Sequence, residues 1–469
     1  MRWRDVLHPV TMERVALLAP REALRDVLAS VADEGTVEFD VAPADADRAT
    51  PEAGPAALRL QSLAAGTAAV AAVAPTSPDL DLCERTGRVD LIAGEAQLER
   101  RASQAVLRGR VAAAVGWMPS EALPRLAERI AGSGGAVVTL PRPAGIDRPT
   151  LLSDTAAARQ FGPLVQTYAT VPYADIDPSL LAGLTFIVMF GMMFADVGHG
   201  ALLVLAAVAA HRGWIAPLAR LRRYWLFLVG AGLASMFFGA LYGEFFGPTQ
   251  VIPVLWIAPM DHPVPMLGAA VVVGAVLLAG SYALGTVNRF REGGWRLALY
   301  SPSGLAGSTL FLGLGLVVGG LYRHAPWLQA AGAVVAALGL AASYVGLYAA
   351  AGGGAGGYGQ AAIELFNLVI RLGSNVVSFA RLAAFGLTHA ALCAVVWEAT
   401  SALWGRGVPA AVAAVVVFTV GNALAFALEG LVAAIQALRL EYFELFSRVF
   451  DSEGRPFRPW HIPMSISEA

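Results

Sequence analysis

Ionisable side chains occur inside two long apolar segments of the second half of the sequence. The first segment, 361–403, contains Glu364, Arg371, Arg381, His389 and Glu398. A charge placed inside a bilayer costs about 2.5–3.5 kcal/mol on insertion scales, so charges that persist there usually line a path or a water-filled cavity. A guanidinium does not lose its proton in proteins. Arg381 therefore predicts a permanent positive charge at membrane depth.

Arg381 lies on a polar stripe of its segment. Ser374, Ser378 and Thr388 stand at offsets of −7, −3 and +7 from it, and these spacings share one face of a helix. We expect an unpaired guanidinium at the centre of this stripe. The alternatives are a structural ion pair or an arginine that reaches the membrane surface.

The second segment, 410–446, carries a similar stripe. Asn422, Glu429 and Gln436 follow one another at spacings of seven residues, and Arg439 comes three residues later. Glu429 and Arg439 are about 15 Å apart along a helix axis and cannot pair with each other. The stripes predict hydrated surfaces that lead ions to and from a central site, although polar stripes also join helices in membranes.

Two further motifs contain weaker candidates. In FGMMFADVGHG (190–200), Asp196 is expected to cap the following helix, and Asp196 and His199 are expected to have a structural or access-channel role. A metal site is not expected, because an aspartate and a histidine alone supply too few ligands. Glu244, in FGALYGEFFG (238–247), is expected at the membrane interface near a channel mouth.

The composition indicates a membrane protein with a polar N-terminal part. The chain of 469 residues is 57% hydrophobic and 14% charged, against about 25% charged in soluble domains. Residues 1–175 are rich in charge, whereas residues 180–450 contain apolar runs long enough to span a bilayer. The segment Met1–Pro9 lacks the apolar stretch of a signal peptide, so the polar part is expected in the cytoplasm.

Lysine is absent from the whole sequence. A normal P-loop and Schiff-base chemistry are therefore excluded, because both need a lysine, and direct nucleotide binding is not expected. Cys83 and Cys393 lie in different halves of the chain and predict neither a disulfide nor a metal site. No cofactor is expected.

The predicted fold class is an α-helical polytopic membrane protein with an N-terminal cytoplasmic α+β domain. Hydrophobic alternation and helix-stop residues predict strands and helices in turn. The strands are 12–19, 36–41, 111–117 and 136–140, and the helices are 21–34, an interrupted stretch from 55 to about 110, and 120–130. The expected divisions are a domain over 1–140, a proline-rich linker over 141–180, a membrane domain over 181–448 and a cytoplasmic tail over 449–469.

Hydropathy and arginine placement predict eight membrane crossings. The block 181–211 is divided into a tight helical hairpin, 181–195 and 198–212, because arginines after it place both ends in the cytoplasm. The next cytoplasmic loop is 289–299, and both termini are cytoplasmic. The other apolar blocks are 224–242, 264–288, 300–321, 328–350, 361–403 and 410–446.

Three motifs give the chain a family resemblance. FGMMFADVGHG, SFARLAAFGLTHAAL (378–392) and LEGLVAAIQALRLEYFELFSRVFDSEGRPFRPW (428–460) resemble the a subunit of V-type ATPases, called subunit I in bacterial and archaeal enzymes. The resemblance extends over essentially the whole chain. It implies eight membrane helices, with the last two long and tilted, in a bacterial inner membrane.

The resemblance also implies roles for individual residues. Arg381 matches the stator arginine that faces the carboxylates of a rotating proteolipid ring, and His389 lies on the same helix. Glu429 matches a carboxylate of an ion half-channel, and Arg439 matches a second arginine. The implied function is a non-catalytic membrane stator that couples ring rotation to proton or sodium movement. The implied partners are the proteolipid c ring, peripheral-stalk subunits and central-stalk subunits, with no nucleic acid.

The sequence departs from this family in two places. The cytoplasmic domain is about half the usual length, and Asn367 stands where a carboxylate is expected, with Glu364 one turn earlier. A stand-alone secondary transporter is the alternative function, but such folds usually contain repeated halves, and 181–288 does not resemble 300–446. A membrane-anchored sensor does not explain charges at membrane depth.

Overall fold

The structure is a computed structural model that describes residues 9–40, 54–63, 70–141, 146–152, 156–450 and 453–465. These residues form two compact units. The sheet unit combines residues 9–152 with the C-terminal segment 454–465, and the helical unit consists of residues 156–453.

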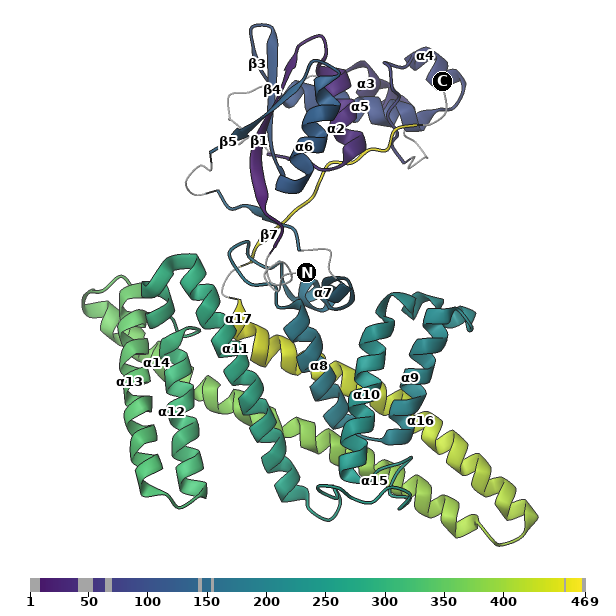
Figure 1. Ribbon diagram of the computed structural model, residues 1–469, viewed down its shortest axis with the longest axis vertical. Helices are drawn as coiled ribbons and strands as arrows, with labels where there is room; N and C mark the ends of the chain where they lie inside the picture. Colours follow the sequence, from purple (N-terminus) through teal and green to yellow (C-terminus); the bar gives the residue numbers. More distant parts are fainter. Residues whose placement is uncertain are drawn as a thin grey trace. The chain divides into compact units, whose positions relative to one another are not determined.

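An antiparallel sheet forms the centre of the sheet unit. Its strand order is β2-β4-β1-β5, with β3 paired to β4 (Figure 1). β1 pairs with β4 along its whole length, from Met12 opposite Pro119 to Pro20 opposite Val111. The strands are β1 (Met12–Pro20), β2 (Glu38–Phe39), β3 (Val106–Arg108), β4 (Val111–Pro119) and β5 (Ala136–Leu140).

Helices complete the sheet unit. They are α2 (Leu24–Glu34), α3 (Pro55–Leu63), α4 (Leu80–Arg85), α5 (Val89–Gln104), a 3₁₀ turn η1 (Ser120–Ala122) and α6 (Leu123–Ala131). Val31 of α2 and Ile130 of α6 are buried with Val15 of β1 in one core. α2 ends where Gly35 adopts a left-handed conformation with φ of 62°, as glycine does after many helices.

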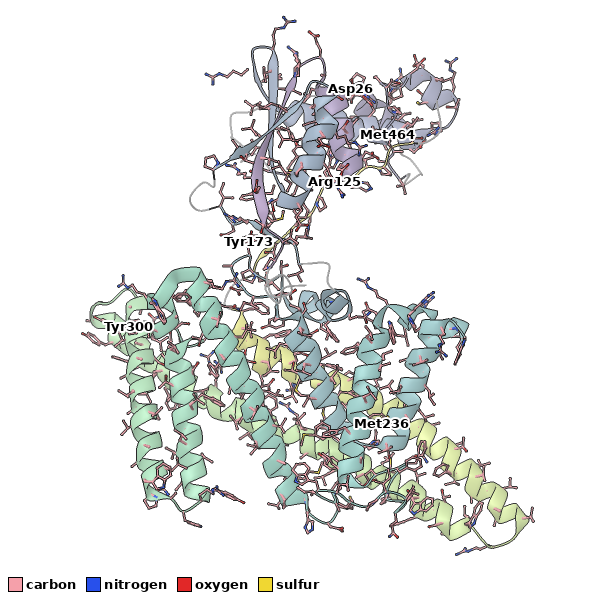
Figure 2. The ribbon with its side chains drawn as sticks, viewed as in Figure 1. Asp26, Arg125, Tyr173, Met236, Tyr300 and Met464 are labelled. Carbon is pink, nitrogen blue, oxygen red and sulfur yellow. The ribbon has the colours of Figure 1, made fainter. Side chains whose placement is uncertain are left out.

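The C-terminal segment 454–465 runs across the sheet unit. β7 (Arg455–Pro456) pairs in parallel with β6 (Pro149–Thr150). The Ile462 amide then donates to the Ala32 carbonyl at 2.9 Å, and its side chain is buried in the core. Near the end of the segment, the Met464 amide donates to Asp33 of α2 (Figure 2). The sheet unit is therefore built from both ends of the chain.

The helical unit consists of helices only. They are α7 (Ala156–Tyr168), α8 (Ser179–Met193), α9 (Val197–Arg212), the 3₁₀ segment η2 (Ala216–Tyr224), α10 (Trp225–Tyr242), α11 (Pro263–Tyr300), α12 (Leu305–Tyr322), α13 (Pro326–Ala350), α14 (Gly354–Ser378), α15 (Ala380–Leu403), α16 (Val408–Leu440), the π-helical segment η3 (Glu441–Phe446) and α17 (Ser447–Val449).

Six helical stretches in the described chain are long and apolar enough to cross a membrane: 220–242, 263–300, 305–322, 326–350, 354–403 and 408–449. Large apolar side chains project outward from them. On α16, Val408, Val412 and Leu428 are 79%, 60% and 61% exposed. Such a surface is typical of contact with lipid or with another membrane protein. The chain is a polytopic helical membrane protein.

The expected hairpin at 181–212 is not a tight one. Its helices end and begin as predicted, with a break at Phe194–Asp196 between α8 and α9, but α10 packs against both of them (Figure 1). Glycines permit this approach, because an added Cβ at Gly191 or Gly200 would meet atoms of α10. α10 therefore separates the two arms.

Two other expectations are corrected by the helices. The predicted loop 289–299 is helical, since α11 continues to Tyr300 with a kink at Gly293 and Gly294. The segment 361–403 is not one regular helix. It consists of α14 and α15, which meet at Phe379, and the run α14–α15 crosses the direction of α12 and α13 obliquely (Figure 1).

Candidate functional site

Arg381 lies in the first turn of α15, directly after the break between α14 and α15. The Leu382 amide donates to the carbonyl of Phe379, three residues back, at 2.9 Å. Phe379 is fully buried, and its ring lies against Gly274 of α11, where an added Cβ would clash. This packing fixes the break. Arg381 Nε then donates to the Ser378 carbonyl at 3.2 Å, which holds the guanidinium close to the break.

The guanidinium of Arg381 is paired within its own chain. Its Nη2 lies 3.2 Å from Oε1 of Glu444, in η3. The expectation of an unpaired Arg381 is therefore wrong. The chain turns back after α15 and brings a carboxylate 63 residues away to the arginine, which spacing within one helix does not reveal.

The ion pair does not enclose Arg381. One guanidinium nitrogen contacts Glu444, and the arginine side chain remains 26% exposed, whereas the glutamate side chain is 7% exposed. A guanidinium has five N–H donors in a planar fork. Arg381 therefore keeps a free face with which to bind a second carboxylate.

His389 and Glu429 form the second pair. His389 Nδ1 bonds to Glu429 Oε2, which joins α15 to α16. His389 is two turns of helix, about 12 Å, from Arg381. Its side chain is 2% exposed, and that of Glu429 is 16% exposed. The pair is a buried, titratable contact that opens on one side.

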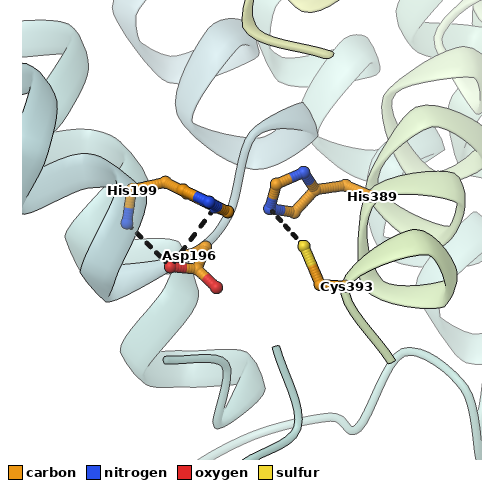
Figure 3. Close-up of side chains that lie close together, drawn as sticks. All are labelled: Asp196, His199, His389 and Cys393. Atoms are coloured by element: carbon orange, nitrogen blue, oxygen red, sulfur yellow. Dashed lines mark hydrogen bonds and ion pairs between the residues drawn. The ribbon is translucent and has the colours of Figure 1, made fainter. Parts of the chain in front are cut away.

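Asp196, His199 and Cys393 surround the other side of His389 (Figure 3). Asp196 caps α9 as predicted, accepting from the His199 amide at 2.8 Å, and its second oxygen accepts from the Gly247 amide at 2.9 Å. Cys393 Sγ lies 3.9 Å from His389 Nε2. The break after α8 and the middle of α15 thus meet in one buried cluster.

Glu244 belongs to the surroundings of this cluster. Glu244 is 4% exposed and lies near Asp196. Its expected position at the membrane interface stays a prediction. The Glu244 carbonyl accepts from the Val197 amide at 3.0 Å. Asn422 of α16 is also buried, and its backbone lies next to His199. Both residues therefore add polar atoms to the cluster.

The remaining candidates lie apart from these two groups. Thr388 and Arg439 are exposed, and the Gln436 side-chain oxygen is buried without a hydrogen bond. The charge of Arg439 acts on the Glu444 carboxylate. Glu364 accepts from Gln360 at 3.1 Å and lines a separate groove of about 350 Å³ with Asn367 and Arg371.

Three residues near the site were not predicted from the sequence to belong to it. Glu444 and Glu441 lie in the motif 428–460, and Cys393 lies one turn after His389. Glu441 is fully buried and accepts from the Thr185 hydroxyl at 3.2 Å. A signal was present, because both glutamates occur at the end of a long apolar segment, where buried carboxylates are rare. The π-helical turn that orients them has no sequence signature, although such turns are frequent at functional sites.

Comparison with known proteins bears on this geometry. The family model described as "V-type ATPase 116kDa subunit family" matches residues 103–260 and 360–462, which is more than half of the chain. The chain belongs to this family. The matched ranges contain both sides of the site: the break at Asp196 with Glu244, and the helices that carry Arg381, His389, Glu429 and Glu444. α12 and α13 lie outside the matched ranges.

Curated relatives in archaea share the family. An A-type ATP synthase subunit I of Thermococcus kodakarensis is 25% identical over 76% of this chain and 55% of its own length. The corresponding proteins of Aeropyrum pernix and Archaeoglobus fulgidus are 27% and 26% identical over 68% and 74% of this chain, and over 51% and 58% of their own lengths. The chain spans about half the length of the curated relatives it matches.

Proposed function

We propose that this chain is the ion-conducting stator of a rotary ATPase. Its partners are then a proteolipid ring, which carries ionisable carboxylates past Arg381, and stalk subunits that bind the sheet unit. The chain itself catalyses no reaction. The observation that carries the proposal is the partly exposed Arg381, held by one contact to Glu444 on a helix with an apolar outer face.

The central step is an exchange of carboxylate partners. As a ring carboxylate approaches, Arg381 binds it through its free donors. An opposite charge within about 4–6 Å favours an ionised carboxylate by about 1–3 pKa units, so the ring carboxylate releases its proton or sodium ion there. When the carboxylate moves on, Glu444 again satisfies the guanidinium. Glu444 thus pairs with Arg381 in the intervals when no ring carboxylate is bound to it.

The two polar groups serve opposite sides of Arg381. The His389–Glu429 pair, with Asp196, His199 and Glu244 around it, lines one half-channel and relays protons or organises water. Gln436 and Arg439 lie toward the other end of α16, with Glu441 and Glu444, and line the other half-channel. Because the guanidinium keeps its charge, it also prevents a cation from passing directly between them.

We propose eight crossings, with α8 and α9 as two short spans and with α15 and α16 tilted in the bilayer. Irregular backbone at membrane depth is tolerated where it is buried in protein, and Asp196, at the break between α8 and α9, accepts from the amides of His199 in α9 and Gly247 after α10. Both termini then lie in the cytoplasm, and the protein resides in the plasma membrane.

Replacing Arg381 tests the proposal. Arg381→Ala in the assembled complex is expected to abolish ATP-driven ion pumping into vesicles while the subunits still co-purify. Arg406→Ala, which removes an exposed arginine of the loop between α15 and α16, is the matched control and keeps pumping. Substantial pumping by the Arg381→Ala complex contradicts the proposal.

A further inference from the structure

The cluster around His389 contains more ligand atoms than the sequence predicted. One ligand atom from each of Asp196, His199, His389 and Cys393 lies within 4.8 Å of the others, and all four side chains are buried. Asp196 and His199 alone supply too few ligands for a metal site. Folding adds His389 and Cys393 from α15, which supplies the four ligands that zinc usually takes.

His199 is the histidine of this cluster whose ring nitrogens are left unsatisfied. Both ring nitrogens of His199 are buried without a hydrogen bond, and its side chain is 0% exposed. An unsatisfied buried polar group costs about 1–3 kcal/mol. A bound metal ion gives such a nitrogen a partner.

The outer contacts match those of metal-binding histidines. A ligating histidine usually donates its other ring N–H to a carboxylate, which fixes the tautomer and the ring orientation. His389 has this arrangement: Nδ1 bonds to Glu429, while Nε2 faces Cys393 (Figure 3). His199 Nδ1 lies 3.6 Å from Asp196 Oδ1, which leaves Nε2 for a ligand. Asp196 is itself oriented by two backbone amides.

We propose that Asp196, His199, His389 and Cys393 form a binding site for a divalent transition-metal ion. Two imidazoles, one thiolate and one carboxylate are the donors that zinc accepts in tetrahedral sites. Cys393 binds as the thiolate and releases its proton to solvent when the metal enters. Mg²⁺ and Ca²⁺ are poor occupants because they prefer oxygen ligands.

The site has a consequence for ion movement. A metal ion on His389 Nε2 occupies the group that pairs with Glu429, so a loaded site blocks the half-channel that we assign to this pair. Binding itself does not depend on that assignment. Metal content therefore tests the site, and zinc sensitivity of pumping tests its link to the proposed function.

The direct test is metal retention by the purified complex. After exposure to Zn²⁺ and dialysis, the native complex is expected to retain about one zinc ion per copy of this chain in the site. Cys393→Ser and His199→Ala lower the affinity at least about 10-fold. Cys83→Ser, which alters the buried cysteine of the sheet unit, is the matched control and leaves retention unchanged. Equal zinc retention by the native and Cys393→Ser complexes overturns the proposal, as does the absence of retained zinc in the native complex.

Co²⁺ provides a second readout that does not depend on activity. A cobalt–thiolate bond gives a charge-transfer absorption band in the near ultraviolet, which is expected in the native complex and absent in Cys393→Ser. Cys393→Ala shows the same loss, and co-purification of the other subunits confirms that each variant assembles. A band that persists in both variants contradicts ligation by Cys393.

Discussion

Two polar groups on the same pair of helices differ in the kind of charge that they hold. The Arg381–Glu444 pair has one permanent charge, and its arginine is 26% exposed. The His389–Glu429 pair and its neighbours are titratable, and His389 and His199 are 2% and 0% exposed. A group that must exchange partners needs an open face, whereas groups that pass a proton to one another need contact and shelter from bulk water.

The two groups also differ in the electrostatic cost of losing one partner. Removing one partner of a buried ion pair is costly because the other charge is left unpaired. Glu444 pairs with Arg381, and in the proposed mechanism this contact avoids the cost whenever no ring carboxylate is near. The His389–Glu429 pair contains no arginine and so no permanent positive charge that could be left unpaired. We therefore expect substitutions in the two groups to fail in different ways.

The largest effect on the titratable group is expected from Glu429. Glu429→Gln removes the carboxylate that pairs with His389 and keeps the shape of the side chain. Proton transfer through a positioned group contributes about 10²–10⁴-fold to rates, so pumping is expected to fall at least about 10-fold. Glu398→Gln, an exposed glutamate of α15, is the matched control. Equal pumping by the Glu429→Gln and Glu398→Gln complexes contradicts the role of the pair.

A smaller effect is expected from the second arginine. Arg439 is exposed, and its charge acts on Glu444 without a direct contact that would fix it. Exposed charges contribute little and are screened by salt, so Arg439→Ala is expected to lower pumping about 2- to 5-fold, with a smaller difference at high salt. Complete loss of pumping at every salt concentration would show that Arg439 is as important as Arg381. That result would contradict the smaller role proposed for Arg439.

The smallest effect is expected outside both groups. Burial and the charge of Glu292 raise the pKa of Asp175 from its ordinary value of 3.8 to about 8. An unfolded chain loses this proton near pH 4, so the folded state becomes relatively less stable as the pH rises from 4 to 8. Asp175→Asn removes this penalty and is expected to stabilise the protein by about 1–2 kcal/mol above pH 8, with no gain below pH 4.

Thermal unfolding in detergent at several pH values measures this effect. Asp261→Asn, in an exposed loop, is the control. Pumping at neutral pH is expected to be unaffected in both variants. A stabilisation by Asp175→Asn that is the same at pH 4 and pH 9 would show that the carboxyl does not keep its proton in the folded protein.

Periodicity predicted the elements of the fold better than their contacts. The strand at Ala136–Leu140 and the helix stop at Gly35 follow directly from local sequence signals. The packing of α10 between α8 and α9 does not, because it depends on glycines that meet across helices. The C-terminal segment was expected as a tail. Its contacts with Ala32 and Asp33 join residues more than 400 positions apart.

The site shows the same division. Arg381, His389 and Glu429 were candidates because each is ionisable and lies inside a long apolar segment, where a charge is costly. This reasoning did not reveal that Glu444 reaches Arg381, because a π-helical turn changes the direction of side chains at the end of α16. Reasoning within single segments also could not group Cys393 with Asp196 and His199, because these residues lie on other parts of the chain. Contacts between helices determine chemistry that no single segment contains.

The central claim is that Arg381 serves a moving carboxylate and does not merely form an ion pair with Glu444. The most direct test compares ATP-driven pumping by complexes with Arg381→Leu, Glu444→Gln and the double substitution Arg381→Leu/Glu444→Leu. A structural pair is often replaced by apolar side chains without loss. Our account predicts that Glu444→Gln keeps much of the pumping, whereas Arg381→Leu and the double variant assemble but do not pump. Restored pumping in the double variant would contradict the account.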